Sequence, residues 1–202
     1  MEERRRDQYR RLATERGYRS RSSFKLIEID RRYKVIKAGD VVVDLGAAPG
    51  GWMQVAMDAV GGSGVVLGVD LKRVERLPED NAMSITGDLR DPELANRIRD
   101  AIGREADVVL CDASPSVSGA WDLDHAIQLD LVEHSLAISK SVLKEGGTFL
   151  TKVFQGDLTD GFVRRLKDHF EMVQLVKPKA SRSRSAEIYV LARGFKKTVP
   201  LE

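Results

Sequence analysis

Residues 41–52, whose sequence is VVVDLGAAPGGW, decide the fold class of this chain. Residues 41–45 form a run that is apolar except for Asp44, which is typical of a strand buried on both faces of a parallel sheet. The small residues at 46–51 predict a tight turn, and residues 52–60 predict a helix. A strand, a turn and a helix in this order indicate the first half of a βαβ unit.

Outward from this stretch, strand-like runs alternate with helix-like periods, which indicates an α/β fold. We expect a mostly parallel, seven-stranded sheet with helices on both faces. The last two strands should pair with each other. The expected further strands are 65–70, 83–86, 107–112, 148–154, 172–176 and 187–192. Four further helices are expected: 24–35, one that begins near residue 91, 126–143 and 158–170. Ser22 or Ser23 should cap the first of them, and the glycine-containing segment 144–147 should end the helix at 126–143.

The bulk composition fits one globular domain. The chain has 202 residues and 42% hydrophobic content, so we expect a single domain over 1–202, with 1–20 as a basic N-terminal extension. No apolar run approaches the roughly 18 residues of a membrane span, and no signal peptide is evident. The single cysteine, Cys111, fits a reducing cytoplasm. The three histidines lack metal-ligand spacing, so no metal is expected, and the protein is expected to be a monomer.

Positive charge is concentrated near the two ends of the chain, although the net charge is only +2. Eight arginines lie within the first 21 residues, and a second cluster begins at Lys177. Two basic clusters flanking one domain favour a surface that binds nucleic-acid phosphates, although solvated faces would look similar. The candidate RNA-binding residues are Arg4, Arg5, Arg6, Lys179, Arg182 and Arg184.

Polar residues gather where the expected strands end, which is where parallel sheets bind ligands. The turn at 46–51 lets a ligand approach the backbone, and the following helix offers free N–H groups. Its glycines stand at 46, 50 and 51, which is not the G-x-G-x-x-G dinucleotide pattern. Asp70 follows roughly twenty residues later, where an acid can hold ribose hydroxyls. These residues predict a ligand that contains adenosine, and both NAD and S-adenosylmethionine fit them.

Several ordered motifs together resemble the FtsJ/RrmJ family of ribose 2′-O-methyltransferases. The resemblance extends from Arg19 to about Ala192 and includes the turn at 44–52. The other motifs are RSSFKL at 21–26, DASP at 112–115, GGTFLTKVF at 146–154 and SRSRSAEIY at 181–189. The resemblance implies a Rossmann-like class I methyltransferase fold and S-adenosylmethionine as the cofactor.

The resemblance also implies the site residues. The cofactor would contact Gly50, Trp52, Asp70, Asp88 and Asp112, and a catalytic tetrad would consist of Lys25, Asp112, Lys152 and Glu187. This set suits the chemistry, because a ribose hydroxyl is a poor nucleophile until a base removes its proton. Lys152 stands in an otherwise apolar strand, where lysine is rare unless it is paired or functional. It is the expected proton acceptor.

Other chemistries fit the sequence less well. Carbon-5 cytosine methyltransferases of RNA need a cysteine nucleophile, commonly just after the proline, where this chain has Ser116. Amino-nitrogen methyltransferases carry an Asp/Asn-Pro-Pro-aromatic motif that Asp112–Pro115 does not match. The missing G-x-G-x-x-G pattern opposes a nicotinamide-dependent oxidoreductase. A non-catalytic RNA-binding protein of ribosome assembly is opposed by candidates at all four tetrad positions.

Within the family, the expected substrate is a uridine ribose of large-subunit ribosomal RNA, and the alternative is a ribose of a tRNA anticodon loop. Bacterial relatives tend to have Ala-Pro-Asn where this chain has Ser114-Pro115-Ser116. Because of that difference, the sequence does not decide the exact identity of the substrate. The compact chain carries no dedicated RNA-binding domain, so we expect ribosomal RNA within a large ribosomal subunit or its precursor as the partner.

Overall fold

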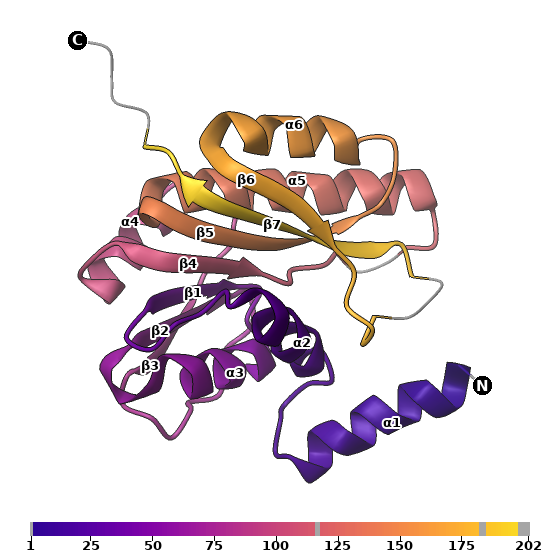
Figure 1. Ribbon diagram of the computed structural model, residues 1–202, viewed down its shortest axis with the longest axis horizontal. Helices are drawn as coiled ribbons and strands as arrows, with labels where there is room; N and C mark the ends of the chain where they lie inside the picture. Colours follow the sequence, from indigo (N-terminus) through magenta and orange to yellow (C-terminus); the bar gives the residue numbers. More distant parts are fainter. Residues whose placement is uncertain (1, 116–117, 182–184, 198–202) are drawn as a thin grey trace.

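The computed structural model describes residues 2–115, 118–181 and 185–197, with side chains from residue 8 onward. The chain forms one seven-stranded sheet in the order β3-β2-β1-β4-β5-β7-β6 (Figure 1). Strands β1 to β5 run parallel, and β7 pairs antiparallel with both β5 and β6. This arrangement confirms the expected mostly parallel, Rossmann-like sheet. The strands are β1 (Val41–Leu45), β2 (Val65–Asp70), β3 (Ala82–Thr86), β4 (Ala106–Cys111), β5 (Leu143–Phe154), β6 (Phe170–Val176) and β7 (Glu187–Phe195).

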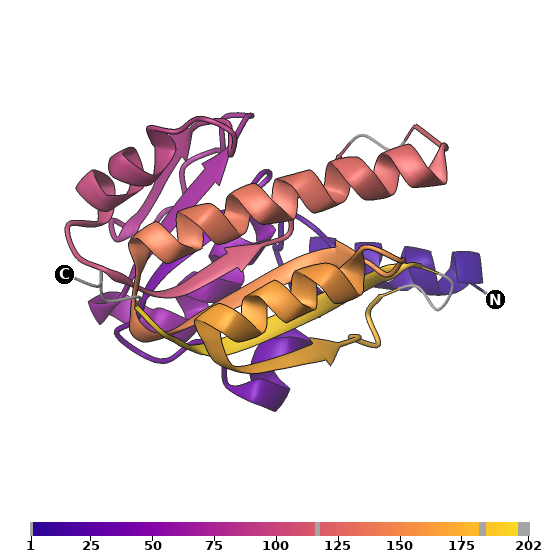
Figure 2. The same ribbon diagram turned by 90° about the horizontal axis from the view of Figure 1, so that it is seen from above.

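Helices cover both faces of the sheet (Figure 2). Helices α2 (Ser23–Tyr33) and α3 (Gly51–Val60) pack on one face through residues such as Leu26 and Met53. Helices α4 (Leu94–Ile102), α5 (Trp121–Val142) and α6 (Thr159–His169) pack on the other face through residues such as Ile98, Val132 and Phe162. Each crossover helix therefore buries one apolar stripe against the strands. A short 3-10 turn, η1 (Gly61–Ser63), links α3 to β2.

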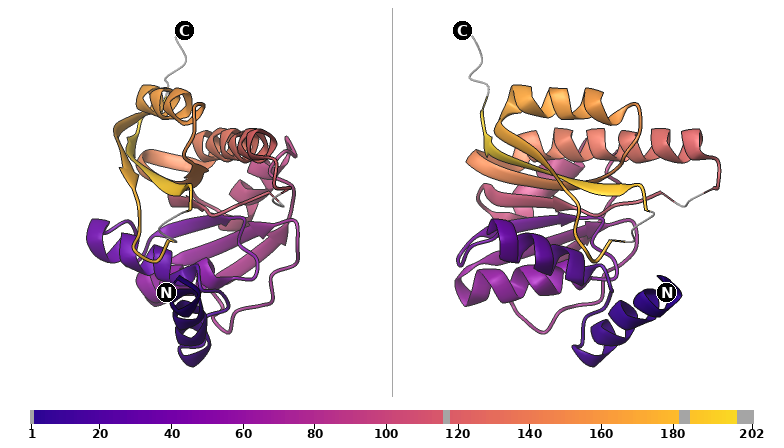
Figure 3. Two further views of the ribbon diagram at one scale, coloured as in Figure 1. Left: turned by 90° about the vertical axis from the view of Figure 1, so that its right-hand side faces the viewer. Right: turned by 45° about the vertical axis from the view of Figure 1, so that its right-hand side comes forward.

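The basic N-terminal segment contains a helix that the sequence analysis did not anticipate. Helix α1 (Glu2–Glu15) extends away from the sheet beside α2 (Figure 3). Its Tyr9 ring lies 5.5 Å from the ring of Phe24, and the guanidinium of Arg16 lies 5.8 Å from that ring. These contacts place the basic segment next to the helix that carries Lys25.

Two boundary predictions were wrong. Helix α5 begins at Trp121 rather than at residue 126, because the Asp124 carboxylate accepts hydrogen bonds from the backbone of Ser118 and Gly119 and closes the preceding loop. Strand β5 begins directly at Leu143, which has an extended backbone and pairs with Ala106, so residues 144–147 interrupt a strand rather than end a helix.

The expected serine cap of α2 is also wrong. Ser22 occupies the N-cap position, but its backbone is helical and its side chain makes no capping hydrogen bond. Its hydroxyl instead pairs with the hydroxyl of Ser20 at 2.8 Å. The helix is entered through a turn in which the N–H groups of Ser23 and Phe24 donate to the carbonyls of Ser20 and Arg21. The first donors of α2 are thus satisfied by backbone.

Among the residues that the structure describes, no helix is both long and apolar enough to cross a membrane. The longest helix, α5, spans 22 residues but carries buried polar side chains and several charges along its length. It packs against β5.

We predict that Phe162 is a principal support of the α6 face. Its side chain is fully buried, so Phe162→Ala should lower the free energy of unfolding by about 3–5 kcal/mol. Met172→Ala is the matched control, because Met172 is 53% exposed on the edge strand and its truncation should change stability by less than about 0.5 kcal/mol. Urea denaturation measures the free energy of unfolding of both variants. Equal effects of the two changes would contradict the packing described here.

Candidate active site

The carboxyl ends of β1 and β4 form the point where the strand order reverses, because β1 pairs with β2 on one side and with β4 on the other. Such a switch point is where open α/β sheets bind ligands. Gly46, with φ of 77°, follows β1 and has no room for a side chain. A Cβ there would lie 2.7 Å from the Cα of Ala113 in the loop after β4. The two loops are therefore in direct backbone contact.

The turn after β1 is held from the N-terminal side by Arg19. Its guanidinium donates to the backbone carbonyls of Pro49, Glu75 and Arg76 at 3.3, 2.6 and 2.9 Å. Gly50, with φ of 108°, then starts α3 and leaves the first-turn N–H groups without intrahelical partners. Arg19 thus fixes the glycine turn to the loop after β2. The sequence analysis gave it no such role.

Two of the three expected acids of the cofactor site lie at or just after the ends of the neighbouring strands β2 and β3. The Asp70 carboxylate accepts hydrogen bonds from the backbone of Ala48 at 3.0 Å and of Lys72 at 2.8 Å, so it is tied to the glycine turn. Asp88 follows β3 and accepts from the backbone of Arg90 at 3.0 Å. Both side chains are partly buried at the carboxyl edge of the sheet.

The buried carboxylate of Asp44 is the most direct indication that this site binds a ligand. Its side chain is fully buried near the end of β1, and neither carboxylate oxygen has a hydrogen-bond partner among the residues that the structure describes. Burial raises the pKa of Asp44 well above the usual range of a carboxyl group, and the carboxylates of Asp112 and Asp70 raise it further. A cofactor with a cationic sulfonium and an ammonium group suits this acidic end of the sheet. The sequence analysis placed Asp44 in the first buried strand without assigning it to the site.

Trp52 is positioned by packing. Its side chain is only 3% exposed, its indole N–H donates to the carbonyl of Ser22 at 3.0 Å, and its ring stacks on Tyr189 with centroids 5.7 Å apart. The indole therefore links α3 to α2 and β7. Its backbone N–H lies in the first turn of α3, where helices offer free donors to a ligand.

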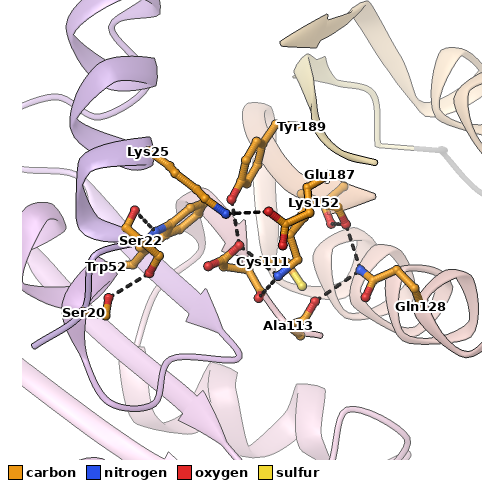
Figure 4. Close-up of polar contacts among 12 residues, drawn as sticks. Ser20, Ser22, Lys25, Trp52, Cys111, Ala113, Gln128, Lys152, Glu187 and Tyr189 are labelled. Carbon is orange, nitrogen blue, oxygen red and sulfur yellow. Dashed lines mark hydrogen bonds and ion pairs between the residues drawn. The ribbon is translucent and has the colours of Figure 1, made fainter. Parts of the chain in front are cut away.

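Lys152 and Asp112 form a buried ion pair. The Lys152 ammonium lies 3.1 Å from Oδ1 of Asp112 and donates to the backbone carbonyl of Asp112 at 2.7 Å (Figure 4). Lys152 is 4% exposed. The same Oδ1 of Asp112 accepts a hydrogen bond from the hydroxyl of Tyr189 at 2.8 Å. Burial, followed by the Asp112 charge, raises the pKa of Tyr189 well above its ordinary value, so this hydroxyl remains a donor.

Lys25 and Glu187 form a second pair beside the first. The Lys25 ammonium lies 2.9 Å from Oε2 of Glu187 and 5.7 Å from the centre of the Tyr189 ring. Burial opposes ionisation of Glu187, but the charges of Lys25 and Lys152 outweigh it and hold the pKa of Glu187 below its usual value. Figure 4 shows Lys25, Lys152, Glu187 and Tyr189 converging from α2, β5 and β7. The structure therefore brings all four expected tetrad residues together.

The register between β5 and β7 explains this convergence. Lys152 lies opposite Tyr189, and Phe154 lies opposite Glu187, so the charged residues share one face of the antiparallel pair. Sequence reasoning missed Tyr189. The available signal was its spacing of two residues from Glu187, which places both side chains on one face of a strand.

Helix α5 supports this site from the opposite face of the sheet. The side-chain amide of Gln128, which is 1% exposed, donates to the backbone carbonyls of Lys152 at 3.0 Å and Ala113 at 3.2 Å. This amide joins the strand that carries Lys152 to the loop after β4. Sequence reasoning missed Gln128, and one buried polar residue on a long helix gives little signal.

Of the six expected RNA-binding residues, only Lys179 has a side chain that the structure describes. Lys179 is exposed, and its loop is fixed by Glu28, whose carboxylate accepts from the backbone N–H groups of Lys179 at 2.9 Å and Ala180 at 3.1 Å. Glu28 lies one turn after Lys25 on α2, so this loop adjoins the tetrad. Arg182 and Arg184 lie outside the described residues, as do the side chains of Arg4, Arg5 and Arg6 on α1.

The sheet order and the site at its switch point define a methyltransferase of the Rossmann-like class. The chain belongs to the FtsJ-like methyltransferase family, whose model matches residues 18–195. The family resemblance inferred from the sequence is thereby confirmed, and S-adenosylmethionine is the cofactor.

The similar proteins support this assignment. Ribosomal RNA large subunit methyltransferase E of Methanocaldococcus jannaschii is 48% identical over 196 residues, which cover 96% of this chain and 80% of that protein. The protein of the same name from Methanothermobacter thermautotrophicus is 48% identical, with 96% and 92% covered. A Plasmodium falciparum structure assigned as a ribosomal RNA methyltransferase has a TM-score of 0.78 at 27% identity, with 88% of this chain and 98% of that chain covered.

We predict that Asp44 destabilises the ligand-free protein as the pH rises. Its pKa is raised in the folded state, so that state holds a proton that the unfolded state has already lost. Stability from this group is therefore present below the ordinary carboxyl pKa of about 4 and falls as the pH rises from there towards the folded value. Asp44→Asn should raise Tm at pH 7, by about 2–4 °C per kcal/mol relieved, and weaken cofactor binding.

Thermal scans between pH 4 and 8, together with calorimetric titration of S-adenosylmethionine, measure both effects. Asp58→Asn on the exposed side of α3 is the control and should change neither quantity. An Asp44→Asn protein that is less stable at pH 7 and binds the cofactor normally would contradict the role given to this carboxylate.

Proposed function

We propose that this chain transfers the methyl group of S-adenosylmethionine to the 2′-hydroxyl of a ribose in large-subunit ribosomal RNA, at a uridine. The observation that carries the proposal is the buried Lys152–Asp112 pair next to the glycine turn. A buried amine beside a methyl-donor site suits an acceptor that must lose a proton. The name shared by the similar archaeal proteins, ribosomal RNA large subunit methyltransferase E, supports the RNA target.

Lys152 is the proposed proton acceptor. When bound, S-adenosylmethionine supplies a methyl carbon made electrophilic by the adjacent sulfonium. A hydrogen bond to the backbone carbonyl of Asp112 and an ion pair with its carboxylate hold Nζ of Lys152 in place. An ammonium has three donors, so Nζ can also bind the ribose hydroxyl. In its neutral form this amine takes the hydroxyl proton while the oxygen forms its bond to the methyl carbon.

The other tetrad residues arrange the reaction. Asp112 and Tyr189 fix the direction of Lys152 through a shared oxygen. The Lys25–Glu187 pair presents an ammonium and a carboxylate to the ribose, where they hold hydroxyl groups by charge-assisted hydrogen bonds. Such positioning of oxygen and methyl carbon in line provides much of the rate enhancement in a transfer of this kind.

The proposed cofactor contacts follow from the placement of the residues around the glycine turn. Gly50 and Trp52 offer backbone N–H groups at the start of α3, which suits the carboxylate end of the cofactor. Asp70 and Asp88 stand at the ends of β2 and β3, where they suit the ribose hydroxyls and the adenine amine. Asp112 then belongs to both sites, because it lies at the switch point and holds Lys152.

The proposed RNA surface combines the two basic clusters. Lys179 stands in a loop fixed to α2, and Arg182 and Arg184 follow it in sequence. Arg4, Arg5 and Arg6 lie on α1, which packs beside α2. We take residues 1–202 as one catalytic domain that acts as a monomer in the cytoplasm, with an RNA target presented by a large ribosomal subunit or its precursor.

Methylation of RNA with labelled S-adenosylmethionine tests this function. We expect label in large-subunit ribosomal RNA, with stronger labelling of subunits than of free RNA, because recognition by this compact chain depends on a preassembled surface. The labelled nucleotide should resist alkaline hydrolysis on its 3′ side and map to a uridine. Label in a base, or in tRNA only, would contradict the proposal.

We predict that Lys152→Ala retains the fold and binds S-adenosylmethionine, yet transfers methyl groups on the order of 10²–10⁴-fold more slowly, because it removes the base. Rapid-quench kinetics on saturated enzyme measure the loss, and calorimetry measures cofactor affinity. Lys167→Ala, on the exposed side of α6, is the control and should keep the wild-type rate. A Lys152→Ala rate within tenfold of wild type would exclude proton transfer to this residue.

A further inference from the structure

An exposed tryptophan contacts the end of the strand that carries Lys152 and has no role in the function described above. Trp121 is the first residue of α5 and is 48% exposed. Its ring lies 5.6 Å from the ring of His125 at an interplanar angle of 22°, and 6.1 Å from the ring of Phe154 at 25°. His125 and Phe154 are only 6% and 9% exposed, so two buried rings support one exposed ring.

The local backbone fixes this stack firmly. Gly156 lies against His125 so closely that a Cβ there would come within 2.3 Å of the imidazole. One turn after Trp121, the Asp124 carboxylate accepts hydrogen bonds from the backbone of Ser118 and Gly119 and so holds the loop that leads into the helix. The Trp121 ring is therefore held in a fixed orientation while about half of its surface stays open to a ligand.

The stack is joined to the catalytic residues through both elements that carry it. Phe154 ends β5 two residues after Lys152 and lies opposite Glu187 in the register with β7. His125 precedes Gln128 by one turn of α5, and Gln128 donates to the backbone carbonyl of Lys152 at 3.0 Å. The exposed ring therefore stands at the carboxyl edge of the sheet, where the ribose of the substrate must enter.

The charges around the ring select which part of an RNA strand can approach it. Asp122 follows Trp121, and Asp157 and Asp160 lie at the start of α6; all three are exposed. Carboxylates repel phosphates, so the sugar–phosphate backbone is kept from this part of the surface. A nucleobase is uncharged and presents an aromatic face, and stacking on an aromatic side chain is how proteins hold unpaired bases of RNA.

We infer that Trp121 is a stacking surface for a nucleobase of the RNA strand, at or next to the nucleotide whose ribose is methylated. This inference rests on the proposed function for the identity of the strand. The stacked base orients the nucleotide, so that its ribose hydroxyl reaches Lys152, while the basic clusters hold the phosphates.

Fluorescence tests the inference without relying on catalysis. The chain has two tryptophans, and Trp52 is 3% exposed whereas Trp121 is 48% exposed. We expect a ten-nucleotide oligouridine to quench the emission of the wild-type protein with saturation. A backbone-matched oligomer of abasic ribose phosphates should not quench it. Trp121→Phe should abolish the quenching.

Binding of labelled oligouridine, followed by anisotropy, measures the contribution of the ring. Trp121→Ala should weaken binding about 5- to 150-fold, whereas Trp121→Phe should remain within about threefold of wild type because phenylalanine also stacks. The dependence of affinity on salt should be the same in all three proteins, because no phosphate contact is removed. Leu158→Ala, which truncates an equally exposed residue at the start of α6, should bind as wild type.

The possible outcomes separate this inference from the proposed function. Absence of quenching in the wild type, or Trp121→Ala binding within twofold of wild type, would overturn the stacking surface even if the protein methylates ribosomal RNA. Base-dependent quenching that is lost in Trp121→Phe would support it even if the methylation assay failed. As a folding control, Trp121→Ala must keep the cofactor affinity and the circular dichroism spectrum of the wild type. If Trp121→Ala does not fold, the comparison of the wild type with Trp121→Phe still tests the inference.

Discussion

The carboxylate of Asp112 is the constraint on which the rest of the site depends. One of its oxygens forms an ion pair with Lys152 and accepts a hydrogen bond from Tyr189, and the backbone carbonyl of Asp112 accepts a hydrogen bond from Lys152. An ammonium that is 4% exposed is costly unless a partner compensates its charge. Removing the carboxylate would leave that charge unpaired, at a cost of about 3–5 kcal/mol, and would release the side chain that our account makes the base.

The second ion pair makes the cluster electrically balanced. Lys25 and Glu187 add one charge of each sign, so two ammonium groups face two carboxylates in a largely buried site. Four different parts of the chain supply these groups, and three of the parts also contact a neighbouring element of the site. Helix α2 fixes the basic loop through Glu28, β4 ends at the cofactor turn, and β5 is tied to α5 by Gln128. The tetrad therefore connects the glycine turn, the Lys179 loop and the strand that carries Lys152.

Sequence patterns predicted the parts of the fold that local burial decides. Strands β1 and β2 have the predicted bounds, because a continuous apolar run buried on both faces leaves little choice of structure. The start of α5 was missed because hydrogen bonds to Asp124 close the preceding loop, and such polar contacts leave no apolar periodicity in the sequence. The start of β5 was missed because Leu143 pairs with Ala106 and begins the strand before the glycines at 146 and 147. Residues 2–15 were taken as a basic extension, although they form a helix that packs through Tyr9.

The sequence could predict which residues form the tetrad but not how their side chains are arranged. The four tetrad residues came from ordered motifs, yet their meeting depends on the β5–β7 register, which joins residues far apart in the chain. The same register explains why Tyr189 was overlooked. For Asp44, a strand pattern predicted burial, but only the structure shows that both carboxylate oxygens lack a partner.

The central claim is that Lys152 removes the proton, and single-turnover kinetics of Lys152→Arg across pH test it most directly. Arginine keeps the positive charge beside Asp112 but stays protonated, so it can hold the site without accepting a proton. With S-adenosylmethionine and large ribosomal subunits in excess over their dissociation constants, the wild-type rate should rise with pH to a plateau. The variant should be on the order of 10²–10⁴-fold slower. A Lys152→Arg protein with a near wild-type rate and the same pH profile would contradict the account and leave Lys152 as an electrostatic group.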